Sequence, residues 1–327
     1  MNVVIVGCGY VGLELACQLA ARGHVVTGVR RSDAGLAAID TLDEGTIRDV
    51  STVSDDVSTG AERVSSAAAD GTVTAVRADA TDLRSLSALP DADVVVYAAS
   101  SGGRGAEAAR AVYVDGLMNV IETYAERDSG PDRLIYTSST GVYGDHDGAW
   151  VDETTPIEPT TPKTRVLADA ERVALEETAT VGIDGTVARF AGLYGPDRYR
   201  LDRYLNGPVT AGYLNMIHRD DAAGAIRWFL ETDAARGAVV NVVDDEPVQK
   251  HAFADWLADE CGVPRPEKRS KAERIDAGDL STAAERRIRT SKRCSNDRLR
   301  SLGYDLEYPT FRDGYHAAIA AYCVSER

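Results

Sequence analysis

The chain has 327 residues, of which 44% are hydrophobic, and its 52 acidic and 36 basic side chains give a net charge of −16 at pH 7. Such a negative chain argues against a protein that binds nucleic acid through its phosphates. Without a run of about 18 apolar residues, we expect no membrane span and no membrane partner. The length fits one large domain with a smaller lobe. Five scattered cysteines indicate reduced thiols in a cytoplasmic protein rather than disulfides or a metal site.

Arginine strongly outnumbers lysine, because 5 of the 36 basic residues are Lys and the other 31 are Arg. An acidic chain with this bias is typical of a halophilic protein, since molar salt screens charges over a few ångströms and makes a dense negative surface tolerable. A GC-rich genome in an ordinary cytoplasm is the alternative, because it also favours Arg. Composition leaves both explanations open.

Strand-like and helix-like patterns alternate from the first residues onward. The expected elements are a strand at Val3–Val6, a helix at Tyr10–Ala21, strands at His24–Val29, Thr72–Arg77 and Val94–Ala99, a helix at Ala106–Ala125, a strand at Arg133–Thr137, a helix from Pro162 to about Glu177, and a strand at Gly185–Phe190. Apolar strands that alternate with helices are buried on both faces, which is typical of a parallel sheet between two helical layers. The pattern predicts an α/β fold with a Rossmann-type doubly wound parallel sheet.

Two regions depart from this alternation. Residues Leu42–Asp70 are rich in Ser, Thr, Asp and Glu, which predicts a polar surface insertion with one helical turn near Ala61–Ala69. Beyond Tyr194 the expected elements are a helix around Ala225–Leu230, a strand at Ala238–Val243, a helix at Ala252–Cys261, a charged surface excursion at Pro264–Arg289, and a closing helix at Thr310–Tyr322 that Thr310 caps. We therefore expect a cofactor-binding Rossmann domain over residues 1–193 and a smaller C-terminal substrate lobe over residues 194–327, interleaved with it.

The first strand runs directly into a G-x-G-x-x-G motif, which is followed at once by a helix. Gly7 would permit the tight turn, Gly9 would let the backbone approach a pyrophosphate, and Gly12 would let the helix pack on the strand. Tyr10 and Val11 open the helix, whose free N–H groups and partial positive charge favour phosphate. A mere tight turn is the alternative. At the start of a strand–helix series, the motif predicts a dinucleotide cofactor.

The residues after the second strand bear on the choice of cofactor. An NAD site needs a carboxylate there for the ribose hydroxyls, whereas this chain has Arg30 and Arg31. Two guanidinium groups can neutralise and hydrogen-bond a 2′-phosphate, while the nearest acid, Asp33, is expected to begin a helix. The pattern favours NADP over NAD, and its alternative is a pair of solvated arginines at a loop edge.

Three further residues are expected around the adenine and ribose. Asp79 follows the strand at Thr72–Arg77, and Ala98 and Ala99 lie at the end of the strand at Val94–Ala99, where the chain turns. Small side chains at the last two positions would let the chain lie against the cofactor. Ordinary strand ends are the competing interpretation.

Four motifs in order give a resemblance over nearly the whole chain. Residues Thr137–Asp145 resemble an S-S-x-x-V-Y-G motif, Arg189–Pro196 an R-x-x-x-x-Y-G-P motif, Ile217–Asp221 an H-V-x-D segment, and Asn241–Val243 an N-V strand. Together they resemble the extended short-chain dehydrogenase/reductases, the group of sugar-nucleotide epimerases and dehydratases. The resemblance implies an NAD(P)-dependent enzyme of the oxidoreductase or epimerase/dehydratase type.

The residues for proton transfer depart from the pattern of that family, in which a Ser, a Tyr and a Lys four residues later act with an upstream Asn. Ser139 matches the family Ser, but Lys163 stands at the Tyr position and Leu167 at the Lys position. The Asn position holds Tyr113, with Asp115 close by as a possible substitute. The chain thus resembles an atypical subgroup of NAD(P)-dependent epimerases in which the active site is poorly kept.

Two candidate catalytic residues remain. Lys163 would serve as a base if burial lowered its pKa, and its alternative is a solvated lysine at a loop edge. Ser139 would hydrogen-bond a substrate oxygen, or else simply cap the end of its strand. His218, Asp220 and Asp221 lack a third ligand at a suitable spacing, so we expect a hydrogen-bonded network there and no metal.

Three classes of function follow from these residues. The first is an NADP-dependent oxidoreductase or epimerase acting on a small molecule with a hydroxyl or carbonyl group, of the sugar-nucleotide kind. The second is a catalytically silent regulator or sensor that binds NADP(H), and the third is a structural protein that would leave the glycine motif without a purpose. The resemblance also implies a homodimer packed through the helices at Ala106–Ala125 and Pro162–Glu177.

Overall fold

A computed structural model of the chain describes residues 1–43, 71–102, 105–278 and 280–325. The polar insertion expected at Leu42–Asp70, with its helical turn at Ala61–Ala69, therefore lies outside the described residues beyond Asp43. The element boundaries below refer to the described part of the chain.

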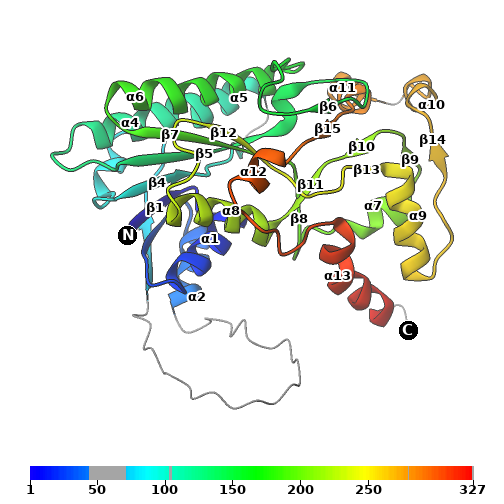
Figure 1. The fold of residues 1–327 in the computed structure, drawn as a ribbon, viewed down its shortest axis with the longest axis horizontal. Coiled ribbons are helices and arrows are strands. Elements are labelled where there is room, and N and C mark those ends of the chain that lie inside the picture. Colours follow the sequence, from blue (N-terminus) through cyan, green and yellow to red (C-terminus); the bar gives the residue numbers. More distant parts are fainter. Residues whose placement is uncertain (44–70, 103–104, 279, 326–327) are drawn as a thin grey trace, which may run out of the picture.

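Seven strands of the described chain form one parallel sheet at the centre of the molecule (Figure 1). Their spatial order is β12 (Val239–Val242), β7 (Asp184–Phe190), β5 (Arg133–Ser139), β4 (Val94–Tyr97), β1 (Asn2–Val6), β2 (Val25–Arg30) and β3 (Thr72–Arg77). The order runs outward from β1 in both directions, which is the arrangement of a doubly wound sheet. The predicted fold class is confirmed.

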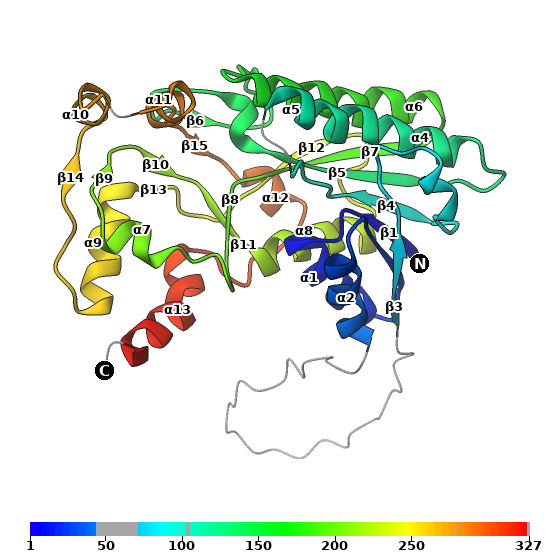
Figure 2. The same ribbon diagram turned by 180° about the vertical axis from the view of Figure 1, so that it is seen from behind.

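Helices cover both faces of this sheet (Figures 1 and 2). One face carries α1 (Tyr10–Ala20), α2 (Asp33–Asp43) and α8 (Arg219–Glu231), and the other carries η1 (Ser85–Ala88), α3 (Ala106–Arg110), η2 (Ala111–Asp115), α4 (Gly116–Ala125), α5 (Pro162–Arg172), η4 (Val173–Glu177) and α6 (Thr178–Thr180). Alternate residues of β1 face opposite layers: Val3 and Ile5 pack on the α1 side, and Val4 and Val6 on the α4 side. The two long helices predicted at Ala106–Ala125 and from Pro162 to about Glu177 are present on the second face, and each contains a π-helical turn.

The rest of the chain forms short strand pairs and helices beside the sheet. These elements are η3 (Thr140–Tyr143), β6 (Trp150–Val151), β8 (Gly192–Tyr194), α7 (Leu201–Leu205), β9 (Val209–Thr210), β10 (Tyr213–Leu214), β11 (Met216–His218), β13 (Val248–Gln249), α9 (Lys250–Cys261), β14 (Lys268–Arg269), α10 (Lys271–Asp276), α11 (Thr282–Arg289), β15 (Arg293–Cys294), α12 (Asp297–Ser301) and α13 (Phe311–Ser325). A separate apolar cluster around Phe253, Phe311 and Tyr315 joins α9 and α13. Thr310 caps α13 as predicted, because its Oγ1 accepts a hydrogen bond of 3.2 Å from the N–H of Arg312.

The segment predicted as a charged surface excursion is more regular than expected. It contains β14, α10 and α11. No residue of α10 is buried, so the helix has no apolar face that a periodicity could reveal. It is stabilised locally by a capping box in which Ser270 and Glu273 each bond the backbone N–H of the other.

The C-terminal half of the chain returns to the central sheet. Strand β12 is one of the two edge strands of this sheet, α8 packs on α1, and β6 pairs with β15. The chain after residue 194 is therefore interleaved with the chain before it. The expected domain boundary between residues 193 and 194 stays a prediction. No helix in the described ranges is long and apolar enough to cross a membrane. Because parallel strands end at one edge, the residues after β1, β2, β4 and β5 meet there.

Candidate functional site

The glycine loop after β1 is closed tightly against the end of β4. Gly7 has a φ of +83°, and a Cβ atom on it would lie 2.3 Å from the Cα of Ala99. Its N–H donates a hydrogen bond of 3.2 Å to the Val29 carbonyl at the end of β2. A Cβ on Gly12 would lie 3.1 Å from the side chain of Ile5. The backbone here thus has the two properties that the motif predicted, a left-handed turn and a close helix–strand contact.

The start of α1 has the properties of an anion site. The residue that precedes it, Gly9, has no side chain to cap the helix, and the first turn carries no acidic residue. The backbone N–H groups of Tyr10, Val11 and Gly12 open the helix, where intrahelical partners are lacking. The helix therefore presents donors and a partial positive charge to a diphosphate. The Tyr10 side chain points elsewhere, since its hydroxyl donates to the Pro196 carbonyl at 2.9 Å.

Arg30 lies over the glycine loop. Its Nη1 donates a hydrogen bond of 3.0 Å to the Cys8 carbonyl. A Cβ atom on Gly35, at the start of α2, would lie 2.5 Å from Nε of the same guanidinium. The side chain is therefore held between the loop and α2, and its positive charge lies beside the start of α1.

A hollow of about 510 Å³ opens at the ends of β2 and β3, and we call it the β2–β3 hollow. Its lining residues are Arg31, Ser32, Arg77, Ala78, Asp79 and Ser85. Arg31 lies 3.7 Å from the Asp79 carboxylate, and Arg77 donates to the Arg31 carbonyl and pairs with Asp33. Burial opposes ionisation of Asp79, but hydrogen bonds from Thr81 and the nearby Arg31 outweigh it and lower the pKa of this carboxyl.

The side chains of Arg30 and Arg31, which are neighbours in the sequence, lie in different places. Arg31 lines it, whereas Arg30 is bound to the glycine loop. Arg77, which sequence reasoning missed, completes the basic wall. The register of the sheet places it beside Arg30, because the two residues are partners at the ends of β2 and β3. Placing the end of the predicted strand Thr72–Arg77 beside the end of the second strand would have identified Arg77 as a site residue.

The two alanines after β4 lie next to the glycine loop, and their expected contact with the adenosine stays a prediction. The Ala98 N–H donates to the Val6 carbonyl at 2.8 Å, which holds the segment beside β1. Ala99 contacts the glycine loop at Gly7. Their side chains pack against the apolar layers on opposite faces of the sheet, Ala98 on the α1 side and Ala99 on the α4 side.

Of the two candidate catalytic residues, Ser139 is engaged in a local cap. Its Oγ accepts a hydrogen bond of 3.1 Å from the Gly141 N–H at the end of β5, which leaves its own O–H proton free to donate. Lys163 is exposed in the first turn of α5, and Leu167 is buried in the apolar layer on the same helix. The Lys163 ammonium lies 5.7 Å from the centre of the Tyr113 ring.

Tyr113 has polar contacts that sequence reasoning did not foresee. Its hydroxyl accepts hydrogen bonds from the backbone N–H of Ser101 at 3.2 Å and from Oγ of the same residue at 3.3 Å. Burial alone would raise the pKa of this phenol, but the bonds from Ser101 and the Lys163 ammonium outweigh it, so that the pKa lies below its ordinary value of 10.0. In the sequence, Tyr113 stood out only as a departure from the Asn that the resemblance implies.

The His218 segment is a hydrogen-bonded network. His218 caps α8 by accepting a bond of 3.3 Å from the Asp220 N–H, and burial lowers the pKa of its imidazole to about 4. The Asp221 carboxylate accepts bonds from the N–H groups of Glu307 and Tyr308, both at 2.8 Å. Within the described residues, no group of three or more His, Cys, Asp or Glu side chains is placed to hold a metal ion.

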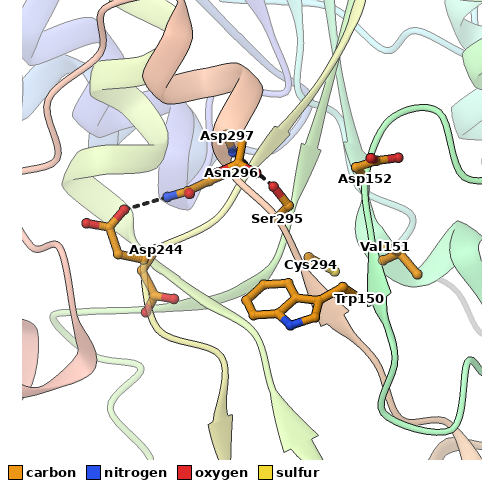
Figure 3. A pocket seen from close by; sticks show the side chains of 9 residues that line it. Trp150, Val151, Asp152, Asp244, Cys294, Ser295, Asn296 and Asp297 are labelled. Carbon is orange, nitrogen blue, oxygen red and sulfur yellow. Dashed lines mark hydrogen bonds between the residues drawn. The ribbon is translucent and has the colours of Figure 1, made fainter.

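A second hollow, of about 390 Å³, lies beside β6, β15 and the end of β12 (Figure 3). In Figure 3, Ser295 and Asn296 lie between Asp244 on one side and Asp152 on the other. Burial raises the pKa of the Asp244 carboxyl well above its ordinary value. Strands β7, β5 and β4 separate β12 from β1, so at about 4.8 Å per strand this hollow is distant from the glycine loop.

Comparisons with known proteins agree with this geometry. Residues 3–242 match the model of the NAD dependent epimerase/dehydratase family. Protein YeeZ of Escherichia coli is 29% identical over 319 residues, which cover 94% of this chain and 96% of that protein. A Methylobacillus flagellatus protein, provisionally assigned as an NAD-dependent epimerase/dehydratase, has a TM-score of 0.70 at 28% identity, with 98% of both chains covered. The dTDP-glucose 4,6-dehydratase of Streptomyces venezuelae, solved with NAD bound, shares the fold with a TM-score of 0.72 at 19% identity over 98% of this chain and 97% of that one.

Proposed function

Because the chain belongs to the NAD dependent epimerase/dehydratase family, we propose that it is an NAD(P)-dependent oxidoreductase of the epimerase type. The observation that carries this proposal is the glycine loop, in which Gly7 is pressed against Ala99 and α1 begins without a cap. The tight turn at Gly7 and the free N–H groups at the start of α1 fit the diphosphate of a dinucleotide. The cofactor, when bound, accepts or donates a hydride at its nicotinamide ring.

NADP is the cofactor that we propose over NAD. Arg31, Ser32 and Arg77 line the β2–β3 hollow, where the 2′-position of the adenosine ribose would lie. Two guanidinium groups and a hydroxyl can hydrogen-bond a 2′-phosphate. The Asp79 carboxylate also lines this hollow, 3.7 Å from Arg31, and a ribose hydroxyl that donates to it is the alternative ligand.

The substrate that we propose is a small molecule of the sugar-nucleotide kind with a secondary alcohol or a ketone. The fold is shared with a dTDP-glucose 4,6-dehydratase and, at 18% identity, with a UDP-glucuronic acid 4-epimerase of Bacillus cereus. In such a reaction the protein must take a proton from the alcohol oxygen as the hydrogen on carbon leaves for the cofactor, and return a proton in the reverse step. Ser139, at the end of β5, has an O–H proton to offer that oxygen.

A catalytically silent NADP(H)-binding regulator is the second candidate. The observation that favours it is the buried Leu167, which stands where the resemblance implies a lysine. An apolar side chain there cannot lower the pKa of a neighbouring acid. Cofactor binding without turnover would be the expected behaviour of such a protein.

Calorimetric titration with NADP⁺ and NAD⁺, followed by product analysis, tests the proposal. The protein would be incubated with each cofactor and with UDP-glucose, UDP-glucuronic acid or dTDP-glucose, and the sugars would be separated by chromatography. We expect tighter binding of NADP⁺ and conversion of at least one sugar nucleotide. Binding without conversion, at low and at molar KCl, would favour the regulator, and a failure to bind either cofactor would refute both candidates.

A further inference from the structure

Three tyrosines lie together between the ends of β4 and β5 and the π-helical turn η2. The ring centres of Tyr97 and Tyr136 are 6.2 Å apart, and the charge of Tyr113 acts on both. Burial raises the pKa of the Tyr97 and Tyr136 phenols far above the ordinary value, so neither can ionise near neutral pH. The Tyr97 hydroxyl donates a hydrogen bond to the Val112 carbonyl.

Tyr113 differs from Tyr97 and Tyr136 because its hydroxyl oxygen accepts hydrogen bonds. Two hydrogen bonds come from Ser101, and the Lys163 ammonium supplies a positive charge from α5. These groups stabilise the phenolate more than the phenol, and they lower the pKa of Tyr113 although the residue is buried. Among the titratable groups that face it in the described residues, Lys163 is the cation, while Tyr97 and Tyr136 stay neutral.

This phenol lies at the same edge of the sheet as the cofactor loop. Ser101, which holds its oxygen, follows Ala99 by two residues, and Ala99 contacts Gly7. Ser139 ends the adjacent strand β5, and a Cβ on Gly141 would lie 3.3 Å from its Oγ and 3.6 Å from Thr164. Because Thr164 follows Lys163, the first turn of α5, from which Lys163 reaches Tyr113, lies next to the end of β5.

We propose that Tyr113 is the proton acceptor and donor of the reaction, that Lys163 is the cation that stabilises its phenolate, and that Ser139 hydrogen-bonds the reacting oxygen of the substrate. In the oxidative direction the hydroxyl proton of the substrate goes to the Tyr113 oxygen, and the hydrogen on carbon leaves with its electron pair for the cofactor. The carbon–oxygen single bond becomes a carbonyl. In the reverse direction the Tyr113 proton returns to that oxygen. The inference rests on the proposed function, because it assigns the proton transfer of that reaction.

The first test measures ionisation of the phenol in the protein without cofactor or substrate. Tyrosinate absorbance would be followed against pH for the wild type and for Tyr113→Phe, Lys163→Met, Lys163→Arg and the control Tyr136→Phe. The control suits this purpose because the Tyr136 hydroxyl is buried without a hydrogen-bond partner in the described structure. The wild type should show a phenol that ionises below 10.0. Tyr113→Phe should abolish this transition, Lys163→Met should move it to higher pH, Lys163→Arg should restore it, and Tyr136→Phe should leave it in place.

The second test measures turnover of NADP⁺ with UDP-glucose, UDP-glucuronic acid and dTDP-glucose. Loss of a general acid/base lowers the rate roughly 100- to 10,000-fold, so Tyr113→Phe should have this effect while its NADP⁺ affinity stays within about twofold. Tyr136→Phe should keep its rate within about twofold. The oxidation rate should rise with pH through the Tyr113 transition, and Lys163→Met should move that rise to higher pH.

The outcomes separate this inference from the proposed function. A Tyr113 phenol that ionises at or above 10.0 overturns the inference whatever the rates. Full turnover by Tyr113→Phe overturns it too, while the proposed function stands. A wild type that binds NADP⁺ and converts none of the three substrates overturns the proposed function, and the inference with it.

Discussion

Replacing Gly7 with Ala perturbs the cofactor loop at the point where the structure leaves it least room. The substitution has two separate costs. A residue with a side chain at a φ of +83° costs about 1–2 kcal/mol. In addition, the new Cβ would lie 2.3 Å from the Cα of Ala99, whereas ordinary contacts begin at 3.4 Å. Since the Cβ position is fixed by the backbone of residue 7 and the Ala99 Cα is a main-chain atom, the loop must move by about 1 Å away from β4.

Gly182 supplies a matched control for the cost of placing a side chain at a positive φ. It has a φ of +77°, close to that of Gly7, but nothing lies within 4 Å of its Cβ position. Gly182→Ala should therefore lower the free energy of unfolding by about 1–2 kcal/mol and leave cofactor binding unchanged. Gly7→Ala should lower it further, and the displaced loop should lose hydrogen bonds to the diphosphate. Each such bond contributes roughly 1.5–3 kcal/mol, so the loss of two weakens binding by about 100-fold or more.

Denaturant unfolding and calorimetric titration with NADP⁺ would be carried out on the wild type and both variants. The decisive comparison is between the two alanine variants, because they share the backbone cost and differ in the clash. If Gly7→Ala bound NADP⁺ within about twofold of Gly182→Ala, the glycine loop would not be the diphosphate site.

Three further predictions concern charge. Arg31→Ala combined with Arg77→Ala should weaken NADP⁺ binding by about 10-fold or more and leave NAD⁺ binding unchanged in calorimetry. Each exposed contact with a phosphate contributes about 1 kcal/mol, and Arg22→Ala is the control, with a side-chain exposure of 59% against 60% for Arg31. His218 has a folded-state pKa of about 4 against an ordinary 6.5, so the unfolded chain takes up its proton first. Unfolding free energy should therefore fall by roughly 3 kcal/mol as pH drops from 6.5 to 4, and His218→Asn should flatten this slope. If the net charge of −16 reflects a halophilic protein, the melting temperature followed by circular dichroism should rise from about 0.1 to 3 M KCl, and a flat or falling curve would contradict this.

The fold could be predicted because its strands and long helices carry strong local signals. The apolar runs that became β1 and β4 are buried on both faces, and the glycine motif falls between β1 and α1. The weaker part was the lobe after residue 194. Apart from β12, its strands are two or three residues long, and α10 is a helix without a buried face. Neither leaves a periodic pattern, although the Ser270–Glu273 capping box was visible in the sequence.

The site was predicted less completely because its contacts join distant segments. Arg30 and Arg31 are neighbours in sequence, but one bonds the Cys8 carbonyl of the glycine loop and the other faces the β2–β3 hollow. The bond from Ser101 to Tyr113 depends on how η2 packs beside the end of β4. Sequence spacing alone does not determine either arrangement.

A crystal structure of the protein with NADP⁺ bound tests the account most directly. We expect the diphosphate on the N–H groups at the start of α1, the 2′-phosphate in the β2–β3 hollow against Arg31 and Arg77, and the nicotinamide ring next to the Tyr113 oxygen. A nicotinamide ring directed away from Tyr113 and Ser139, or a cofactor bound outside the glycine loop, would contradict it.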